Sequence, residues 1–362
     1  MLDGGSDEKV QESQLQIERR TVSFSTSLLL HVTSLQFLSM LLLTSQQTVM
    51  PLLIRSASKS HSFLPSTSVF LMEVMKLTAC LLAVFANEGF YWKPFAQRIQ
   101  DDILDKGKET LKVGVPAFVY ALQNNLYYIS LENIDAATYS VTYQLRILTT
   151  AVLAVVILNK RLSGLQWLAL FCSLVGVIGV QLDGAHAQST SLNKGNWLIG
   201  FGAVFSMCWT SAFAGVYFEK MLKTPNADMW IQNLRLSIMT LFFATAGMLL
   251  TDGEKISHGG FFQGWIPLVW VITIINSVGG LAVSAVMKHA DNVKKTYCQS
   301  IAVGLTSIIS ILLGERVLTL LLSLGVGLVI LSVYVYASYP PEKEKEARGN
   351  YQLLEQKLDE TV

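Results

Sequence analysis

The sequence predicts an all-α polytopic membrane protein with about ten transmembrane helices. Of its 362 residues, 51% are hydrophobic and 15% are charged, whereas soluble domains carry about 25% charged residues. The hydrophobic residues also fall in long runs, and about 20 such residues are what one helix needs to cross a bilayer. A soluble protein of this length would need far more polar surface, so a soluble class is excluded.

Apolar runs of bilayer length recur along the whole chain. They place the expected spans at residues 24–44, 66–86, 113–132, 137–158, 163–182, 196–218, 229–250, 265–288, 296–313 and 318–338. We therefore divide the chain into an N-terminal tail (1–23), a first five-helix repeat (24–182), a second five-helix repeat (183–338) and a C-terminal tail (339–362).

A weak internal repeat supports this division into halves. Thr138-Tyr139 begins the fourth expected span, and Thr296-Tyr297 begins the ninth. The fourth span starts on one side of the membrane and the ninth starts on the other, so the halves are expected to be inverted. Transporters built this way bind their substrate between the repeats, near the midplane of the bilayer.

The placement of basic residues predicts that both termini are cytosolic. An even number of spans puts the termini on the same side, and cytosolic loops carry an excess of Lys and Arg. The termini and the loops after the even-numbered spans hold most of the 27 Lys and Arg residues. The opposite loops hold only Arg55, Lys59, Lys194, Lys255 and Arg316.

Net charge and cysteine usage exclude other classes of function. The formal net charge is +1, so no bulk basicity indicates a nucleic-acid partner. The four cysteines lie inside apolar runs without the spacing of a zinc site, and we interpret them as small buried hydrophobic residues. No cofactor and no metal are expected. The cysteines are Cys80, Cys172, Cys208 and Cys298.

One basic residue lies deep in the fourth expected span. A charged side chain at the bilayer centre costs about 2.5–3.5 kcal/mol, and Arg146 is too deep to reach either interface easily. Tyr139, Tyr143 and Arg146 are spaced i, i+4 and i+7 and share one helix face. A cation beneath two aromatic hydroxyls suits a phosphate with a ribose or base. The alternative is an arginine paired to a carboxylate such as Glu73.

Polar residues also interrupt the second and third spans. Lys76 follows Glu73 by three residues, so the two either neutralise each other or leave Lys76 to bind a ligand. Gln123-Asn124-Asn125 occupies the middle of the third span. Amides inside membranes often bond to neighbouring helices, but three in a row cannot all face one partner. At least one is expected to reach a cavity.

Two further polar groups lie at span ends. Lys295 follows Lys294 at the start of the ninth span, where a helix N-terminus attracts anions. An ordinary cytosolic basic flank is the alternative, and it explains Lys294 at least. Tyr217 and Glu219 end the sixth span and either line a cavity or cap the helix. The whole set is rich in cations and poor in acids, which favours a phosphate-bearing ligand over a cation.

Six stretches of the chain carry a family resemblance. They are Gln123-Asn124-Asn125, Asp135-Ala136-Ala137-Thr138-Tyr139, Val141-Thr142-Tyr143-Gln144-Leu145-Arg146, Gly215-Val216-Tyr217-Phe218-Glu219-Lys220, Gly260-Phe261-Phe262-Gln263-Gly264 and Ala290-Asp291-Asn292. Taken in order, they resemble those of the nucleotide-sugar transporters in the drug/metabolite transporter superfamily, most of all the branch that carries UDP-galactose or UDP-N-acetylglucosamine. The resemblance implies ten helices and the exchange of a nucleotide sugar for a nucleoside monophosphate in the Golgi apparatus membrane.

The resemblance also implies which residues contact the nucleotide. Family members usually have Lys where this chain has Arg146, which keeps the charge but changes its geometry. Lys295 is usually followed by Gly, but Thr296 follows it here. Asn233 is followed four positions later by Ser237, where CMP-sialic-acid members tend to have an aromatic residue, and this favours a UDP-sugar. The expected substrate-binding residues are Lys76, Asn124, Asn125, Tyr139, Tyr143, Arg146, Tyr217, Asn233, Asn292 and Lys295.

Two other functions compete with this interpretation. One is a related exporter of a different small organic solute. The other is a membrane glycosyltransferase or phosphotransferase, supported by Asp101-Asp102-Ile103-Leu104-Asp105, which is similar to a magnesium-diphosphate motif. That motif occurs once and stands among basic residues, so a solvated loop explains it better. The expected partners are a nucleotide sugar, a nucleoside monophosphate and membrane lipid, and the sequence is compatible with a homodimer.

Overall fold

The computed structural model describes residues 34–57, 63–186, 196–314 and 317–341. The regular structure of these residues is helical, without strands. Eight of the helical segments are long and apolar enough to cross a membrane. The predicted class, an all-α polytopic membrane protein, is therefore confirmed. The count of ten spans and the inverted repeat stay predictions.

The helices follow one another with short connections. The first described helix covers Ser34–Ala57. A five-residue π-helical turn covers Gln100–Leu104, directly after the helix that ends at Ile99. The others are α2 (Pro65–Asn87), α3 (Trp92–Ile99), α4 (Gly107–Asn133), α5 (Ala136–Tyr143), α6 (Arg146–Leu158), α7 (Gly164–His186), α8 (Trp197–Leu222), α9 (Met229–Gly259), α10 (Pro267–His289), α11 (Asn292–Leu312) and α12 (Leu320–Ser338).

Local sequence explains where several helices begin. Pro65 and Pro267 stand in the first turn of α2 and α10, where the missing N–H of proline is harmless. Asp228, Asp291 and Thr319 precede α9, α11 and α12, and each side chain accepts a hydrogen bond from a backbone N–H of the first turn. These caps satisfy donors that a helix leaves unpaired at its start.

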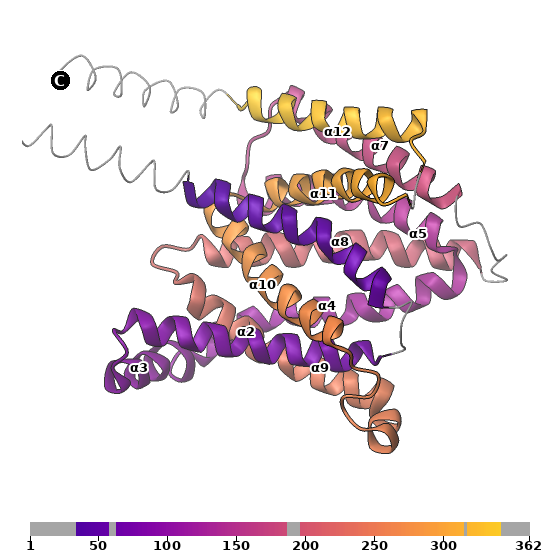
Figure 1. The fold of residues 1–362 in the computed structure, drawn as a ribbon. Helices are drawn as coiled ribbons and strands as arrows, with labels where there is room; N and C mark the ends of the chain where they lie inside the picture. Colours follow the sequence, from indigo (N-terminus) through magenta and orange to yellow (C-terminus); the bar gives the residue numbers. More distant parts are fainter. Residues whose placement is uncertain (1–33, 58–62, 187–195, 315–316, 342–362) are drawn as a thin grey trace, which may run out of the picture.

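The long helices form one bundle in which most lie side by side (Figure 1). Helices α7 and α12 lie along one side, α2 and α9 lie along the opposite side, and α4 and α8 pack together between them. The short helix α3 projects beyond the end of α2. Apolar side chains of α12 such as Leu320, Leu324 and Ile330 are largely exposed, as expected for a surface that faces lipid.

Contacts between the two expected halves are reciprocal at one crossing. Helices α7 and α12 approach at Gly176 and Gly325, where a Cβ added to either glycine would lie 2.8 Å from the carbonyl oxygen of the other. Gly176 also faces Val329, and Gly325 faces Val180, each four residues beyond the opposite glycine. A two-fold relation between the halves would produce this reciprocity.

The first described helix extends beyond its expected end at residue 44. It continues to Ala57 because the polar residues that end the apolar run are buried against other helices. Gln46 packs against Gly279 of α10, and the backbone carbonyl of Thr48 accepts a hydrogen bond from Thr306 of α11. The predicted boundary was wrong because tertiary partners remove the penalty for polar groups in a span.

The fourth expected span is interrupted rather than continuous. Helix α5 ends at Tyr143, a turn covers Gln144 and Leu145, and α6 begins at Arg146.

Helix α9 also extends beyond its expected end at residue 250. Polar residues continue it to Gly259, and in this extension Lys255 pairs with Asp252 at 2.8 Å.

Candidate substrate-binding site

Two tyrosines and an arginine meet around the interruption between α5 and α6. The rings of Tyr139 and Tyr143 stack with centroids 5.7 Å apart and an interplanar angle of 12°. The guanidinium carbon of Arg146 lies 4.7 Å from the ring centre of Tyr143, a cation–π distance. The predicted shared face therefore persists across the break in the helix.

The start of α5 fixes where these tyrosines lie. The Asp135 carboxylate accepts hydrogen bonds from the backbone N–H and the hydroxyl of Thr138, at 2.9 and 2.6 Å. Tyr139 follows at once, and its ring meets the edge of Tyr127 from α4 at a centroid distance of 5.2 Å. The Asp-Ala-Ala-Thr-Tyr stretch is thus a helix cap that aims an aromatic ring at its neighbours.

The Tyr143 hydroxyl joins three helices. Gln123 of α4 donates to it through Nε2 at 2.8 Å, and the hydroxyl donates to Ser211 Oγ of α8 at 3.3 Å. Gln123 Oε1 is buried without a hydrogen-bond partner among the described side chains. The expected substrate-binding set omitted Gln123 and Ser211. A single serine in an apolar run gives no local sign of its role.

Arg146 lacks an acidic partner among the side chains that the structure describes. Its Nε is buried without a hydrogen bond. Lys295 at the start of α11 is close enough to interact electrostatically with both Arg146 and Glu219. However, both carboxylate oxygens of Glu219 are already engaged, by Lys223 and by the backbone N–H of Asn292. Two cations thus stand together without a free acid, an arrangement that favours an anionic ligand.

Glu73 does not pair with Arg146, so that alternative is wrong. Its carboxylate instead accepts two hydrogen bonds from Lys76 Nζ, both at 2.9 Å, and one from the Thr240 hydroxyl at 2.6 Å. The Lys76 stem also packs against Gly280 of α10. In this conformation Lys76 and Glu73 form the self-neutralising pair, and a ligand role for Lys76 stays a prediction.

The four expected asparagines differ in how well their partners are defined. Asn233 is satisfied, since its Nδ2 donates to the Met229 carbonyl and its Oδ1 accepts from Ser284. Asn292 is 1% exposed, and neither atom of its amide group has a partner among the described residues. Asn124 and Asn125 lie on α4, but their side chains are outside the part that the structure describes.

Asn292 and Tyr217 lie on the helices that flank the cluster. A Cβ on Gly215 of α8 would come within 2.6 Å of Asn292 Nδ2, so only glycine leaves room for this amide. The ring of Tyr217 on α8 packs against Phe213 with centroids 5.7 Å apart. The structure thus brings Tyr139, Tyr143, Arg146 and Lys295 together, while Lys76 and Asn233 are engaged in contacts of their own.

Arg235 lies in the second turn of α9 and is buried. The residue is 2% exposed. Its guanidinium donates to the carbonyl of Asp102 and pairs with Glu109 at 3.0 Å. It therefore joins α9 to the segment that links α3 and α4.

The acidic motif of the enzyme alternative is neutralised within its own loop. Asp102 pairs with Arg98 and Lys106, both at 2.7 Å, and Asp105 accepts a hydrogen bond from Gln100. Among the described residues, no group of three or more His, Cys, Asp or Glu side chains could hold a metal ion. A magnesium-diphosphate centre has no support at this loop.

A bundle of apolar helices around a tyrosine-lined cluster, whose cations have no free acidic partner among the described residues, is the arrangement expected of a membrane carrier for an anionic solute. The family model described as nucleotide-sugar transporter matches residues 31–337, and the chain belongs to this family. It is therefore a transporter and not an enzyme.

Curated relatives agree with this assignment. The chain is 40% identical over 315 residues to a UDP-N-acetylglucosamine transporter of Canis lupus familiaris, covering 85% of this chain and 97% of that one. It is 38% identical over 305 residues to a UDP-galactose translocator of Bos taurus, covering 84% and 78%. A solved crystal structure, 12% identical with a TM-score of 0.60, covers 84% of this chain and 97% of its own and shares the fold alone.

Proposed function

We propose that this chain carries UDP-galactose, UDP-N-acetylglucosamine or both from the cytosol into the Golgi lumen in exchange for UMP. The observation that carries the proposal is the pair of cations, Arg146 and Lys295, without a free acidic partner among the described side chains. The relatives named as UDP-N-acetylglucosamine transporter and UDP-galactose translocator support the uridine and the sugars.

Each part of the ligand has a matching group in the cluster. Arg146 and Lys295 supply charged donors for phosphate oxygens, and such charge-assisted bonds are the strong ones. The stacked rings of Tyr139 and Tyr143 offer an aromatic surface and hydroxyls for a base or ribose. UMP and a UDP-sugar share these parts, so one site serves both.

Exchange is also favoured because both glutamates that are buried within the described helices, Glu73 and Glu219, already have partners. Proton-coupled carriers use a carboxylate that faces a cavity and titrates. Here Glu73 is engaged by Lys76 and Thr240, and Glu219 is engaged by Lys223 and the Asn292 backbone. Lys223 lies one turn beyond Glu219 on the same helix, so this ion pair is local.

The cycle that we propose moves the two halves, 24–182 and 183–338, around this site. Cytosolic termini and a Golgi membrane location belong to the same proposal. The positive-inside distribution of Lys and Arg supports the orientation, and the relatives named as UDP-sugar transporters support the location.

Uptake by proteoliposomes tests the function directly. Liposomes preloaded with UMP should accumulate a UDP-sugar several times faster than empty liposomes, and GDP- and CMP-sugars should not substitute. Equal rates in empty and preloaded liposomes would contradict exchange. Transport of an unrelated solute with no response to any nucleotide sugar would favour the competing exporter.

A further inference from the structure

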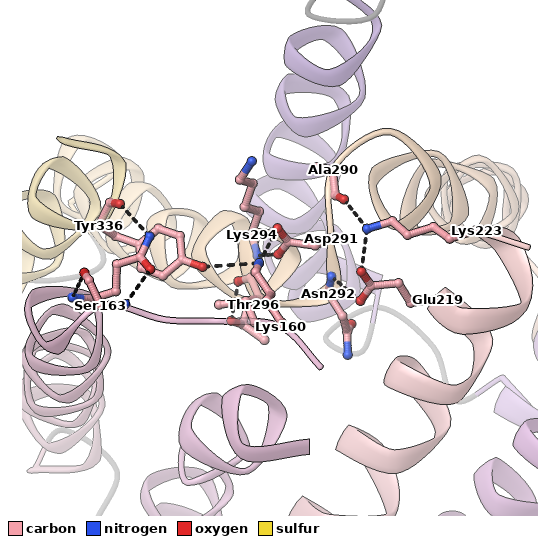
Figure 2. Close-up of polar contacts among 12 residues, drawn as sticks. Lys160, Ser163, Glu219, Lys223, Ala290, Asp291, Asn292, Lys294, Thr296 and Tyr336 are labelled. Carbon is pink, nitrogen blue, oxygen red and sulfur yellow. Dashed lines mark hydrogen bonds and ion pairs between the residues drawn. The ribbon is translucent and has the colours of Figure 1, made fainter. Parts of the chain in front are cut away.

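A polar network surrounds the junction between α10 and α11, close to the ends of α6 and α8 (Figure 2). Lys160, just after α6, pairs with Asp291 Oδ2 at 2.6 Å. The other oxygen of Asp291 caps α11 by accepting from the Lys294 backbone N–H at 2.7 Å. Lys160 also reaches the hydroxyl of Tyr336 on α12 at 3.5 Å.

Helix α8 holds the same junction from the other side. Lys223 donates to the carbonyl of Ala290 at 2.6 Å and pairs with Glu219 at 2.6 Å. Glu219 in turn accepts from the backbone N–H of Asn292 at 2.9 Å. The junction is therefore held by side chains from both sides (Figure 2).

The acidic side chains of this network are more deeply buried than the neighbouring cluster. Asp291 is 7% exposed and Glu219 is 1% exposed, whereas Tyr139, Arg146 and Lys295 in the neighbouring cluster are partly accessible. The backbone N–H of Lys295 bonds to the Asp291 carbonyl at 3.0 Å. Thus one helical turn separates this network from the candidate phosphate site.

The Lys160–Asp291 pair joins the first expected half to the second. Its side chains are 23% and 9% exposed, so the pair lies at the edge of the buried network, where water that enters on opening can solvate both charges and let a single pair break reversibly. The contact between Gly176 and Gly325 also joins the halves, but it is close backbone packing that would be costly to separate. Of these two contacts, the ion pair is the one suited to opening.

We propose that the Lys160–Asp291 ion pair is a gate contact, which closes this end of the carrier and has to break in every transport cycle. The proposal rests on the proposed exchange function, because a gate is needed only if the site is exposed alternately to the two sides. When the pair breaks, the junction keeps its contacts to α8 and moves with it away from Lys160.

A reversible cross-link tests whether the contact has to open. In the double variant Lys160→Cys/Asp291→Cys, the cysteine at 160 is much shorter than the lysine that it replaces, so a direct disulfide would not span the gap between the two sulfur atoms. A short bis-methanethiosulfonate linker is therefore used to join them. We expect the cross-linked protein to bind UMP as the reduced protein does but to lose exchange, and reduction should restore exchange. The parent chain, treated alike, controls for the native cysteines.

Labelling tests whether the pair holds this end closed, without any nucleotide. Thr296 is buried inside the network, so Thr296→Cys reports opening by its reaction with a membrane-impermeant maleimide. Adding Lys160→Gln should speed labelling by about threefold or more. Adding Arg161→Gln should not, because Arg161 is exposed and makes no described contact.

Either of two results overturns the gate. One is a cross-linked protein that exchanges as fast as its reduced form. The other is equal labelling of Thr296→Cys in the Lys160→Gln and Arg161→Gln backgrounds. If the parent chain binds neither UMP nor a UDP-sugar, the proposed function fails by itself, and the labelling result still decides whether the pair closes this end.

Discussion

Replacing Arg146 with alanine should weaken UMP binding strongly while leaving the fold almost unchanged. The guanidinium makes one described contact, the cation–π contact with Tyr143, and its buried Nε has no hydrogen-bond partner. Removing it therefore leaves no acid unpaired inside the protein. It also removes the repulsion between Arg146 and Lys295, so the temperature of unfolding should stay the same or rise.

The loss of affinity follows from the bond that the phosphate loses. A hydrogen bond to a charged group contributes about 1.5–3 kcal/mol, and each 1.4 kcal/mol changes a dissociation constant about tenfold. We therefore expect UMP to bind Arg146→Ala about 10- to 100-fold more weakly than the parent chain. Arg146→Lys keeps the charge but loses the planar fork of donors, so its affinity should fall between the two.

Calorimetric titration of purified protein with UMP measures the affinity, and thermal unfolding of the same samples without ligand measures stability. The two results together separate a ligand-binding arginine from a structural one. If Arg146→Ala unfolds at a much lower temperature, or binds UMP as well as the parent chain does, the assignment of Arg146 to the phosphate is refuted.

Further expectations concern the other cations, the topology and the driving force. Lys295→Ala should weaken UMP binding by a similar factor in the same titration. Lys76→Ala should destabilise the protein by about 3 kcal/mol because it leaves Glu73 buried and unpaired, and adding Glu73→Gln should recover most of that loss in thermal unfolding. A glycosylation tag at Ser257 should be modified in the lumen and one at Pro225 should not; the reverse pattern would overturn the orientation. UDP-sugar uptake into UMP-loaded vesicles should continue with a protonophore present, and its collapse would contradict exchange.

The sequence predicts the parts of the fold that depend on local pattern. Apolar runs locate the spans because each helix must bury its own backbone polar groups in lipid. The spacing of Tyr139, Tyr143 and Arg146 likewise predicts one shared face, and the stacked rings confirm it. In both cases the controlling interactions lie within a few residues of one another.

Local sequence patterns could not predict interactions between residues that lie far apart in the sequence. The helix that covers Gln46 extends past its apolar run because Gly279 lies opposite. Arg235 is buried because Glu109, far away in the sequence, pairs with it. Ser211 meets Tyr143 for the same kind of reason. The candidate site could be predicted as residue types on particular spans, while the partners of each group depend on how the spans pack.

The contrast between paired and unpaired cations supports exchange over one-way transport. Lys76 has Glu73 and Arg235 has Glu109, so these cations are neutralised by the protein itself. Arg146 has no described acid, and Lys295 faces it near a glutamate that is already engaged. An empty site thus keeps two neighbouring positive charges in a region of low dielectric, where repulsion is strong. A bound phosphate offsets that repulsion, so the loaded carrier should change conformation more readily than the empty one, and the return step should depend on a second anion such as UMP.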